Sequence, residues 1–75
     1  MAAPRKPSLR HVLGVNIRRE RTVRAWAQEE LAHQAKLSQT YISQVESGKR
    51  AVSVDAVERI AVAFGLEPEL LFRKT

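Results

Sequence analysis

The middle of the chain carries two short helical segments separated by a tight connection, and this pair restricts the fold more than any other feature. The first segment covers about residues 26–35 and the second about residues 39–47, with Ser38 positioned as an N-cap. Helices joined so closely cross at a steep angle, which requires a small residue where they approach and apolar residues facing inward. Ala32 is that small residue, and the inward set consists of Leu31, Ala35, Leu37, Ile42 and Val45.

Apolar residues recur at helical spacing on both sides of this pair. Leucine and isoleucine at every fourth position predict an amphipathic helix over about residues 8–24. A second run begins at Val54 and predicts a helix that stops at Gly65, and Pro68 then opens a short last helix that ends near Phe72. No stretch alternates with a period of two over a useful length. The pattern therefore predicts an all-α fold, a compact five-helix bundle.

The chain of 75 residues has room for one domain with a small core. Residues 1–7 contain two prolines and two basic residues, so we expect a flexible basic arm there and the folded domain over residues 8–75. The absence of cysteine excludes disulfides and thiolate chemistry and agrees with a reducing cytoplasm. Neither a long apolar run nor an apolar leader is present, so we expect no membrane partner and a cytoplasmic location.

The chain is basic, with 13 Lys and Arg residues against 8 Asp and Glu residues and a net charge of +5. This surplus favours a polyanionic partner, although charge alone does not distinguish specific binding from general attraction. The outer face of the second short helix is more informative, because its side chains are polar and uncharged. Their amides and hydroxyls suit the donor and acceptor edges in a DNA major groove. We therefore expect contact with double-stranded DNA through Gln39, Thr40, Ser43 and Gln44.

Over about residues 13–71 the sequence resembles the helix-turn-helix family of phage repressors and Cro proteins. The stretches that carry the resemblance are LGVNIRRER, QEELA, YISQVESGKR and VERIAVAFGLEPELL. The resemblance implies a lambda-repressor-like DNA-binding fold, in which the second short helix is the recognition helix. Within the family, the string YIS-x-x-E-x-G-K-R followed by a short fifth helix looks most like restriction-modification controller proteins and other compact dimeric repressors.

The resemblance also implies roles for single positions. The outer-face residues of the recognition helix match base-reading positions, and because glutamine can pair with adenine through two hydrogen bonds, we expect adenine in the half-sites. Gln28 matches a glutamine that grips a backbone phosphate at a helix start. Further matches to phosphate-contacting positions, which would set register and salt dependence, are Ser38, Tyr41, Ser47, Lys49 and Arg50. Arg21 and Glu46 match a buried salt bridge between the first and third helices. The arginines of residues 18–24 fit either a solvated face or additional phosphate contacts.

Three positions depart from the family pattern. Lys36 stands where glycine is usual, so either the lysine adopts a left-handed backbone or the turn differs. Ala27 replaces a Ser or Thr cap, and Ala25 replaces a glycine at the end of the first helix. We therefore expect an irregular junction over residues 22–27, away from the proposed reading face.

The C-terminal segments contain more large apolar residues than a small core can absorb. We expect a two-fold interface built from Leu66, Leu70, Leu71 and Phe72. A homodimer would place two recognition helices in successive major grooves of a roughly palindromic operator, about 34 Å apart. Bound at a promoter, it would repress by covering the site or activate by contacting RNA polymerase.

Other classes of function fit less well. An antitoxin-like protein-interaction module would be expected to carry an extended segment for its partner, and the chain stops soon after the last helix. An enzyme would need a nucleophile beside a base or a phosphate-binding loop, and neither pattern is present. His11 and His33 have no partners at metal-ligand spacing, so we expect no metal, no cofactor and no small-molecule ligand.

Overall fold

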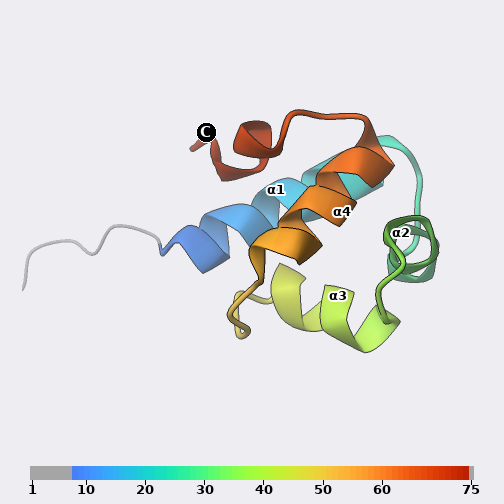
Figure 1. Cartoon of the computed structure of the whole chain (residues 1–75), viewed down its shortest axis with the longest axis horizontal. Coiled ribbons are helices and arrows are strands. Elements are labelled where there is room, and N and C mark those ends of the chain that lie inside the picture. Colours follow the sequence, from blue (N-terminus) through green and yellow to red (C-terminus); the bar gives the residue numbers. More distant parts are fainter. Residues whose placement is uncertain (1–7, 75) are drawn as a thin grey trace, which may run out of the picture.

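The computed structural model describes residues 8–74, which form four α-helices and a final 3₁₀ helix (Figure 1). The elements are α1 (Leu9–Val23), α2 (Gln28–Ala35), α3 (Gln39–Glu46), α4 (Val54–Phe64) and η1 (Pro68–Phe72). The described residues contain no strand, and the predicted all-α fold is confirmed. The prediction of five α-helices is wrong for the last element, because the PELLF segment is too short to wind beyond 3₁₀ turns. The basic arm predicted for residues 1–7 lies outside the described residues.

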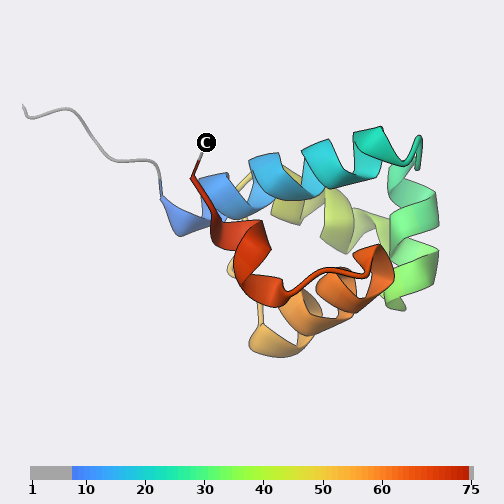
Figure 2. The same cartoon turned by 90° about the horizontal axis from the view of Figure 1, so that it is seen from above.

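One hydrophobic core receives a side chain from every element. The short helices α2 and α3 pack on each other, α3 also packs on α1, and α2 packs on α4. The chain after α4 runs back so that η1 lies against both α1 and α4 (Figure 2). Burying each large apolar side chain contributes about 1.5–3 kcal/mol. The buried residues of α3, Ile42 and Val45, therefore fix the position of this helix against the core. The largest fully buried residues are Ile17, Leu31, Ile42, Val45, Ile60 and Leu71.

Serine N-caps determine where three of the helices begin. The hydroxyl oxygens of Ser8, Ser38 and Ser53 accept hydrogen bonds from backbone N–H groups in the first turns of α1, α3 and α4. Each cap contributes about 1 kcal/mol by satisfying an otherwise unpaired donor. Ala27 offers no such side chain at the start of α2. Because the cap of α3 is in place, the recognition helix predicted from the sequence begins at the expected residue.

The junction between α1 and α2 is irregular, and α2 begins two residues later than the apolar pattern predicts. Ala25 has a left-handed backbone with φ of 56°, and the N–H of Trp26 donates to the carbonyl of Arg21 at 2.9 Å. Trp26 therefore belongs to the turn rather than to α2. Its ring is partly buried and stacks on Phe64, with 5.8 Å between ring centroids.

Arg24, next to this junction, joins the C-terminal ends of α1 and α4. Its Nη2 donates to the carbonyl of Phe64 at 2.7 Å, and its Nη1 donates to the carbonyl and the carboxylate of Glu20. The guanidinium also lies over the Phe64 ring, with Cζ 4.6 Å from the centroid. The positive charge of Arg24 at the carboxyl end of α4 interacts favourably with the negative end of the helix dipole.

Two residues in α1 support the fold in ways that the apolar pattern did not indicate. A Cβ atom at Gly14 would lie 2.5 Å from the carbonyl oxygen of Glu46, so α1 and α3 touch backbone to backbone there. Asn16 is buried, and its Nδ2 donates to the carbonyls of Leu71 and Arg73, each at 2.8 Å. This pair of hydrogen bonds fastens the end of η1 to α1. A lone amide within an apolar stripe is the signal that could have identified Asn16.

Across residues 8–74, every helix is too short or too polar to cross a bilayer.

Candidate nucleic-acid interface

The outer face of α3 carries the four side chains predicted to read bases. Ile42 and Val45 anchor the inner face of the helix in the core. A short amphipathic helix held in this way must turn its polar positions outward. On that side Gln39, Thr40 and Ser43 are exposed and Gln44 is half-buried. These side chains present amide and hydroxyl groups without a formal charge.

The same four residues share a shallow hollow with Gln28, the first residue of α2. The hollow has a volume of about 270 Å³ and is lined by Gln28, Gln39, Thr40, Ser43 and Gln44. The structure therefore brings one predicted phosphate ligand beside all four predicted base readers. Because α2 and α3 meet at a tight turn, residues eleven positions apart open onto one surface.

The carboxylate of Glu46 links the helices around this hollow through hydrogen bonds. Arg21 donates to its carboxylate twice, from Nε to Oε2 at 2.7 Å and from Nη2 to Oε1 at 3.0 Å. Gln28 Nε2 also donates to Oε1, at 3.1 Å, and Arg21 Nη1 donates to the carbonyl of Trp26. The hydrogen bond to Glu46 raises the pKa of Arg21, its burial opposes that rise, and the carboxylate charge adds to it. The first three helices are thus joined through one carboxylate.

Lys36 occupies the turn between α2 and α3 in a left-handed conformation, with φ of 59° and ψ of 44°. Of the two possibilities that the sequence left open, the structure therefore shows a lysine in the geometry that usually requires glycine. The carbonyl of Lys36 accepts a hydrogen bond from Arg59 Nη1 at 3.4 Å. The turn keeps its usual shape at some cost in backbone strain.

Tyr41 and Arg50 form a cluster at the edge of α3. The Arg50 guanidinium lies over the Tyr41 ring, with Cζ 4.7 Å from the centroid, and its Nη1 donates to Gln44 Oε1 at 2.7 Å. The Tyr41 oxygen accepts a hydrogen bond from the N–H of Ser53 at 3.4 Å. A phosphate ligand predicted from the sequence therefore lies in contact with a predicted base reader.

The remaining predicted phosphate ligands differ in what their side chains do. The Ser38 oxygen caps α3 by accepting from the N–H of Tyr41, and the Ser47 hydroxyl donates to the carbonyl of Gln44 at 2.9 Å. Lys49 is exposed. The first turn of α3 contains no acidic residue, which leaves its N–H groups favourable to an anion. The first turn of α2 carries Glu29 and Glu30, which weaken that preference beside Gln28.

Comparison with known proteins assigns the fold and its two short helices to a family. The sequence profile described as helix-turn-helix matches residues 17–71. The chain belongs to the helix-turn-helix family. The matched range contains both α2 and α3, and the resemblance stated from the sequence is confirmed.

Relatives of this helix-turn-helix chain include two bacterial proteins. A hypothetical transcription factor of Neisseria meningitidis serogroup B is 40% identical over 63 residues, which cover 84% of this chain and 59% of that protein. The chain thus spans less than two thirds of the Neisseria relative. Control protein C.BamHI of Bacillus amyloliquefaciens is 38% identical over 63 residues, which cover 83% of this chain and 78% of that protein.

Solved structures have the same architecture as this helix-turn-helix chain. The crystal structure of the Neisseria hypothetical transcription factor NHTF superposes with a TM-score of 0.86 at 36% identity, covering 97% of this chain and 84% of that chain. The restriction-modification controller protein C.AhdI of Aeromonas hydrophila superposes with a TM-score of 0.81 at 35% identity, covering 84% of this chain and 96% of that chain.

The C-terminal residues predicted to form a dimer interface are not equally accessible in this helix-turn-helix protein. Leu71 is 0% exposed and belongs to the core of its own chain, so it offers no surface to a second copy. Its side chain packs in the hydrophobic core, and the hydrogen bond from Asn16 to its backbone carbonyl holds η1 against α1. Leu70 is 38% exposed, while Leu66 and Phe72 are partly buried. The predicted interface therefore reduces to these three residues, and whether they form one stays a prediction.

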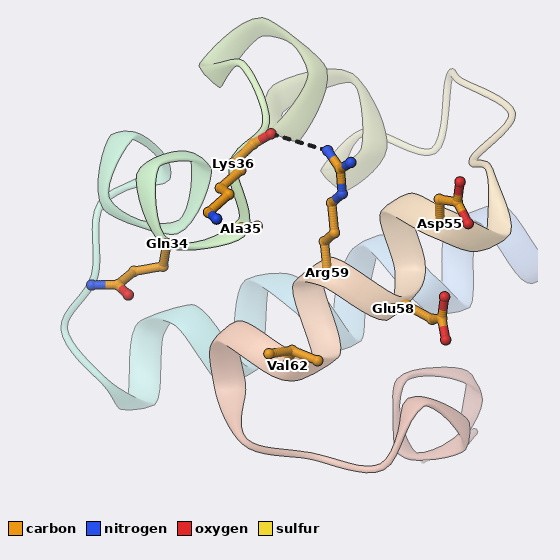
Figure 3. Close-up of a pocket in the computed structure, with 7 residues that line it drawn as sticks. All are labelled: Gln34, Ala35, Lys36, Asp55, Glu58, Arg59 and Val62. Atoms are coloured by element: carbon orange, nitrogen blue, oxygen red, sulfur yellow. Dashed lines mark hydrogen bonds between the residues drawn. The ribbon is translucent and has the colours of Figure 1, made fainter.

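A second hollow, of about 560 Å³, lies between the end of α2 and α4 (Figure 3). It is lined by Gln34, Ala35, Lys36, Asp55, Glu58, Arg59 and Val62, and the Arg59 hydrogen bond to Lys36 crosses it. None of the predicted site residues lines it. Within residues 8–74 of this helix-turn-helix protein, no three His, Cys, Asp or Glu side chains gather in a way that could hold a metal ion.

Proposed function

We propose that this helix-turn-helix protein is a sequence-specific regulator of transcription that binds double-stranded DNA as a homodimer. The observation that carries the proposal is the outer face of α3, where Gln39, Thr40, Ser43 and Gln44 line one hollow without a formal charge. Such a face suits base edges, which present neutral donors and acceptors. The family profile, the relative called a hypothetical transcription factor and the relative called a control protein support the DNA-binding role.

In this proposal α3 enters the major groove and its four outer side chains meet base edges. Lys49, Arg50 and the N-terminal ends of α2 and α3 meet phosphates, which fix the register of the helix and make binding depend on salt. A dimer joined through Leu66, Leu70 and Phe72 presents two copies of α3 to half-sites about 34 Å apart. The operator is then roughly palindromic.

The finer role that the comparisons favour is that of a restriction-modification controller, acting in the cytoplasm of a bacterium. Two of the proteins that the chain resembles, C.BamHI and C.AhdI, are named as control or controller proteins. A regulator of this kind represses by covering a promoter and activates by touching RNA polymerase from a flanking site. Its input would be the concentration of the dimer, since only the dimer spans both half-sites.

The test is selection of bound sequences from a random duplex library by the full chain, at about physiological salt. A two-fold symmetric site bound at least about a thousandfold more tightly than a scrambled duplex is the expected result. Weak binding that depends strongly on salt, with no enriched site, would contradict the proposal. That result would leave an antitoxin-like role, with a protein as the main partner, as the next hypothesis.

A further inference from the structure

The Gln44 side chain, on the proposed reading face, has its orientation fixed by a residue outside α3. Arg50 Nη1 donates to Gln44 Oε1 at 2.7 Å. A guanidinium carries donors only, so Gln44 must turn its oxygen toward Arg50 and its nitrogen away from it. In the described part of the chain, Gln44 Nε2 has no hydrogen-bond partner of its own. The side chain therefore offers an incoming base two donors and an oxygen that is already engaged.

Arg50 is itself held in place. Its guanidinium stacks over the Tyr41 ring at 4.7 Å, and this ring packs against the core. The Tyr41 oxygen accepts a hydrogen bond from the N–H of Ser53, which ties the ring to the start of α4. A charged group that rests on a fixed ring and bonds an amide loses little freedom when DNA arrives. The orientation of Gln44 is therefore set before binding.

This orientation changes which base Gln44 can read. Pairing with adenine needs both ends of the amide, since Oε1 accepts from N6 and Nε2 donates to N7. Arg50 takes one of the two lone pairs of Oε1, so the N6 amino group of adenine would have to share this oxygen with a cationic donor, whose positive charge repels the amino hydrogens. Guanine presents two acceptors in the major groove, N7 and O6, and both suit the free Nε2 group.

We propose that Arg50 is a specificity-determining residue that acts through Gln44, making it select guanine rather than adenine at the base pair it faces. The inference rests on the proposed function and revises one expectation from the sequence, in which each glutamine favoured adenine. Gln39 forms no side-chain hydrogen bond among the described residues, so the adenine expectation stands at its position. The two glutamines of α3 thus read different bases.

The experiment compares sites selected from a random duplex library by the full chain and by three variants. Gln44→Ala locates the base pair that Gln44 reads, because preference at that pair alone is lost. Arg50→Ala frees Oε1, and at the same pair the guanine-to-adenine ratio should fall by at least about fivefold, the lower end of what a bidentate contact discriminates. Lys49→Ala is the matched control, since it removes one neighbouring positive charge and should weaken all sites alike.

A further variant guards against loss of binding in Arg50→Ala. Arg50→Lys keeps the charge but lacks the flat guanidinium that stacks on Tyr41, so a smaller shift in the same direction is expected with better-retained affinity. Circular dichroism should show unchanged helix content, because Arg50 is exposed. Adding Arg50→Ala to Gln44→Ala should change the preference at that pair no further, as a double-mutant cycle requires if Arg50 acts through Gln44.

The outcomes separate this inference from the proposed function. If the unmodified chain enriches no site, the proposed function fails and the inference fails with it. If the chain enriches a site but both Arg50 variants keep the guanine preference and only bind more weakly, the DNA-binding function stands. Arg50 would then be a phosphate ligand alone, and the inference would be overturned. A Gln44→Ala variant with unchanged base preference would overturn it equally.

Discussion

The guanidinium of Arg21 grips the carboxylate of Glu46 through two hydrogen bonds, with Nε 2.7 Å from Oε2. The two side chains are 14% and 5% exposed, so water solvates neither well. Glu46 is the last residue of α3, and Arg21 lies near the end of α1. The pair therefore locks the position of the proposed recognition helix against the longest helix of the domain.

Glu46→Ala should destabilise the protein by about 3–5 kcal/mol, because it leaves the Arg21 charge buried without a partner. Urea unfolding followed by circular dichroism measures the change. The double variant Arg21→Met with Glu46→Leu should recover most of the loss, since it buries no charge. A Glu46→Ala variant as stable as the unmodified chain would mean that water already solvates both charges, so that the pair adds no stability.

The stabilisation that the Arg21–Glu46 pair contributes should also stay constant from neutral to mildly alkaline pH. Its hydrogen bond to Glu46 raises the pKa of Arg21 above the value in the unfolded chain. A group with a raised pKa contributes its full stabilisation below the unfolded pKa and loses it only as the pH climbs through the folded one. The stability difference between the unmodified chain and Arg21→Met should therefore be the same at about pH 7 and about pH 9.

Gly14→Ala should destabilise the protein, although alanine is the better helix former by about 0.5–1 kcal/mol. The added Cβ would lie 2.5 Å from the Glu46 carbonyl and 2.8 Å from that of Val45, both of them backbone atoms that cannot rotate away. Overpacking of this kind costs about 1–3 kcal/mol. Thermal unfolding compares the variant with Val15→Ala, an exposed change in the same helix that should be nearly neutral. Equal melting of the two variants would refute a close approach of α1 and α3.

Lys36→Gly should stabilise the protein slightly. A left-handed backbone costs a residue with a side chain about 1–2 kcal/mol, and the greater freedom of glycine in the unfolded chain offsets about 0.5–1 kcal/mol of that gain. Lys36→Ala is the control, because it removes the same charge but keeps the strain at φ of 59°. If both variants unfold at the same urea concentration, the charge rather than the backbone determines stability at the turn.

Lys49→Ala should weaken DNA binding at every sequence and lower the slope of log affinity against log salt by about 0.9, the effect of one phosphate contact. Lys74→Ala removes the same charge from the segment after η1, on the opposite side of the molecule from α3 (Figure 1). Titrations at several salt concentrations should leave its slope unchanged. Equal slopes for the two variants would show that Lys49 acts only through net charge.

Leu70→Asp should weaken the proposed dimer and leave the monomer folded, because Leu70 is already 38% exposed. Sedimentation equilibrium gives the dissociation constant, and circular dichroism reports the fold. Val23→Asp places the same charge at a valine that is 75% exposed on α1, and it should dimerise normally. Dimerisation that survives Leu70→Asp would remove η1 from the interface.

Periodicity and capping account for most of what could be predicted of the fold. The apolar stripe of α1 and the serine before α3 are local patterns, and each fixes an element without knowledge of its neighbours. The start of α2 was predicted too early, because Trp26 continues the apolar pattern although Ala25 turns the chain. The hydrogen bonds that hold the end of residues 68–72 against α1 come from Asn16, more than fifty positions earlier in the sequence, so no local pattern contains them.

The candidate site, like the fold, has one part that local sequence patterns predict and another part that they do not. Helical spacing placed Gln39 and Ser43 on one face, and the structure has both lining one hollow. The engagement of Gln44 by Arg50 joins residues on either side of a turn, and the spacing of their side chains follows from the path of that turn. How closely α3 approaches α1 depends on Gly14, which is far from α3 in sequence. This spacing could therefore not be predicted without the three-dimensional structure.

The hydrogen bonds from Asn16 have a consequence for the length of an operator. They fix η1 to α1, and α1 touches α3 directly at Gly14, so no flexible link separates the C-terminal surface from the recognition helix. Two copies joined through η1 would span their half-sites as one stiff body. One extra base pair between half-sites displaces the second by about 3.4 Å along the duplex and turns it by about a tenth of a helical turn. A rigid pair cannot follow that movement, so such a regulator would tolerate changes of base more readily than changes of spacing.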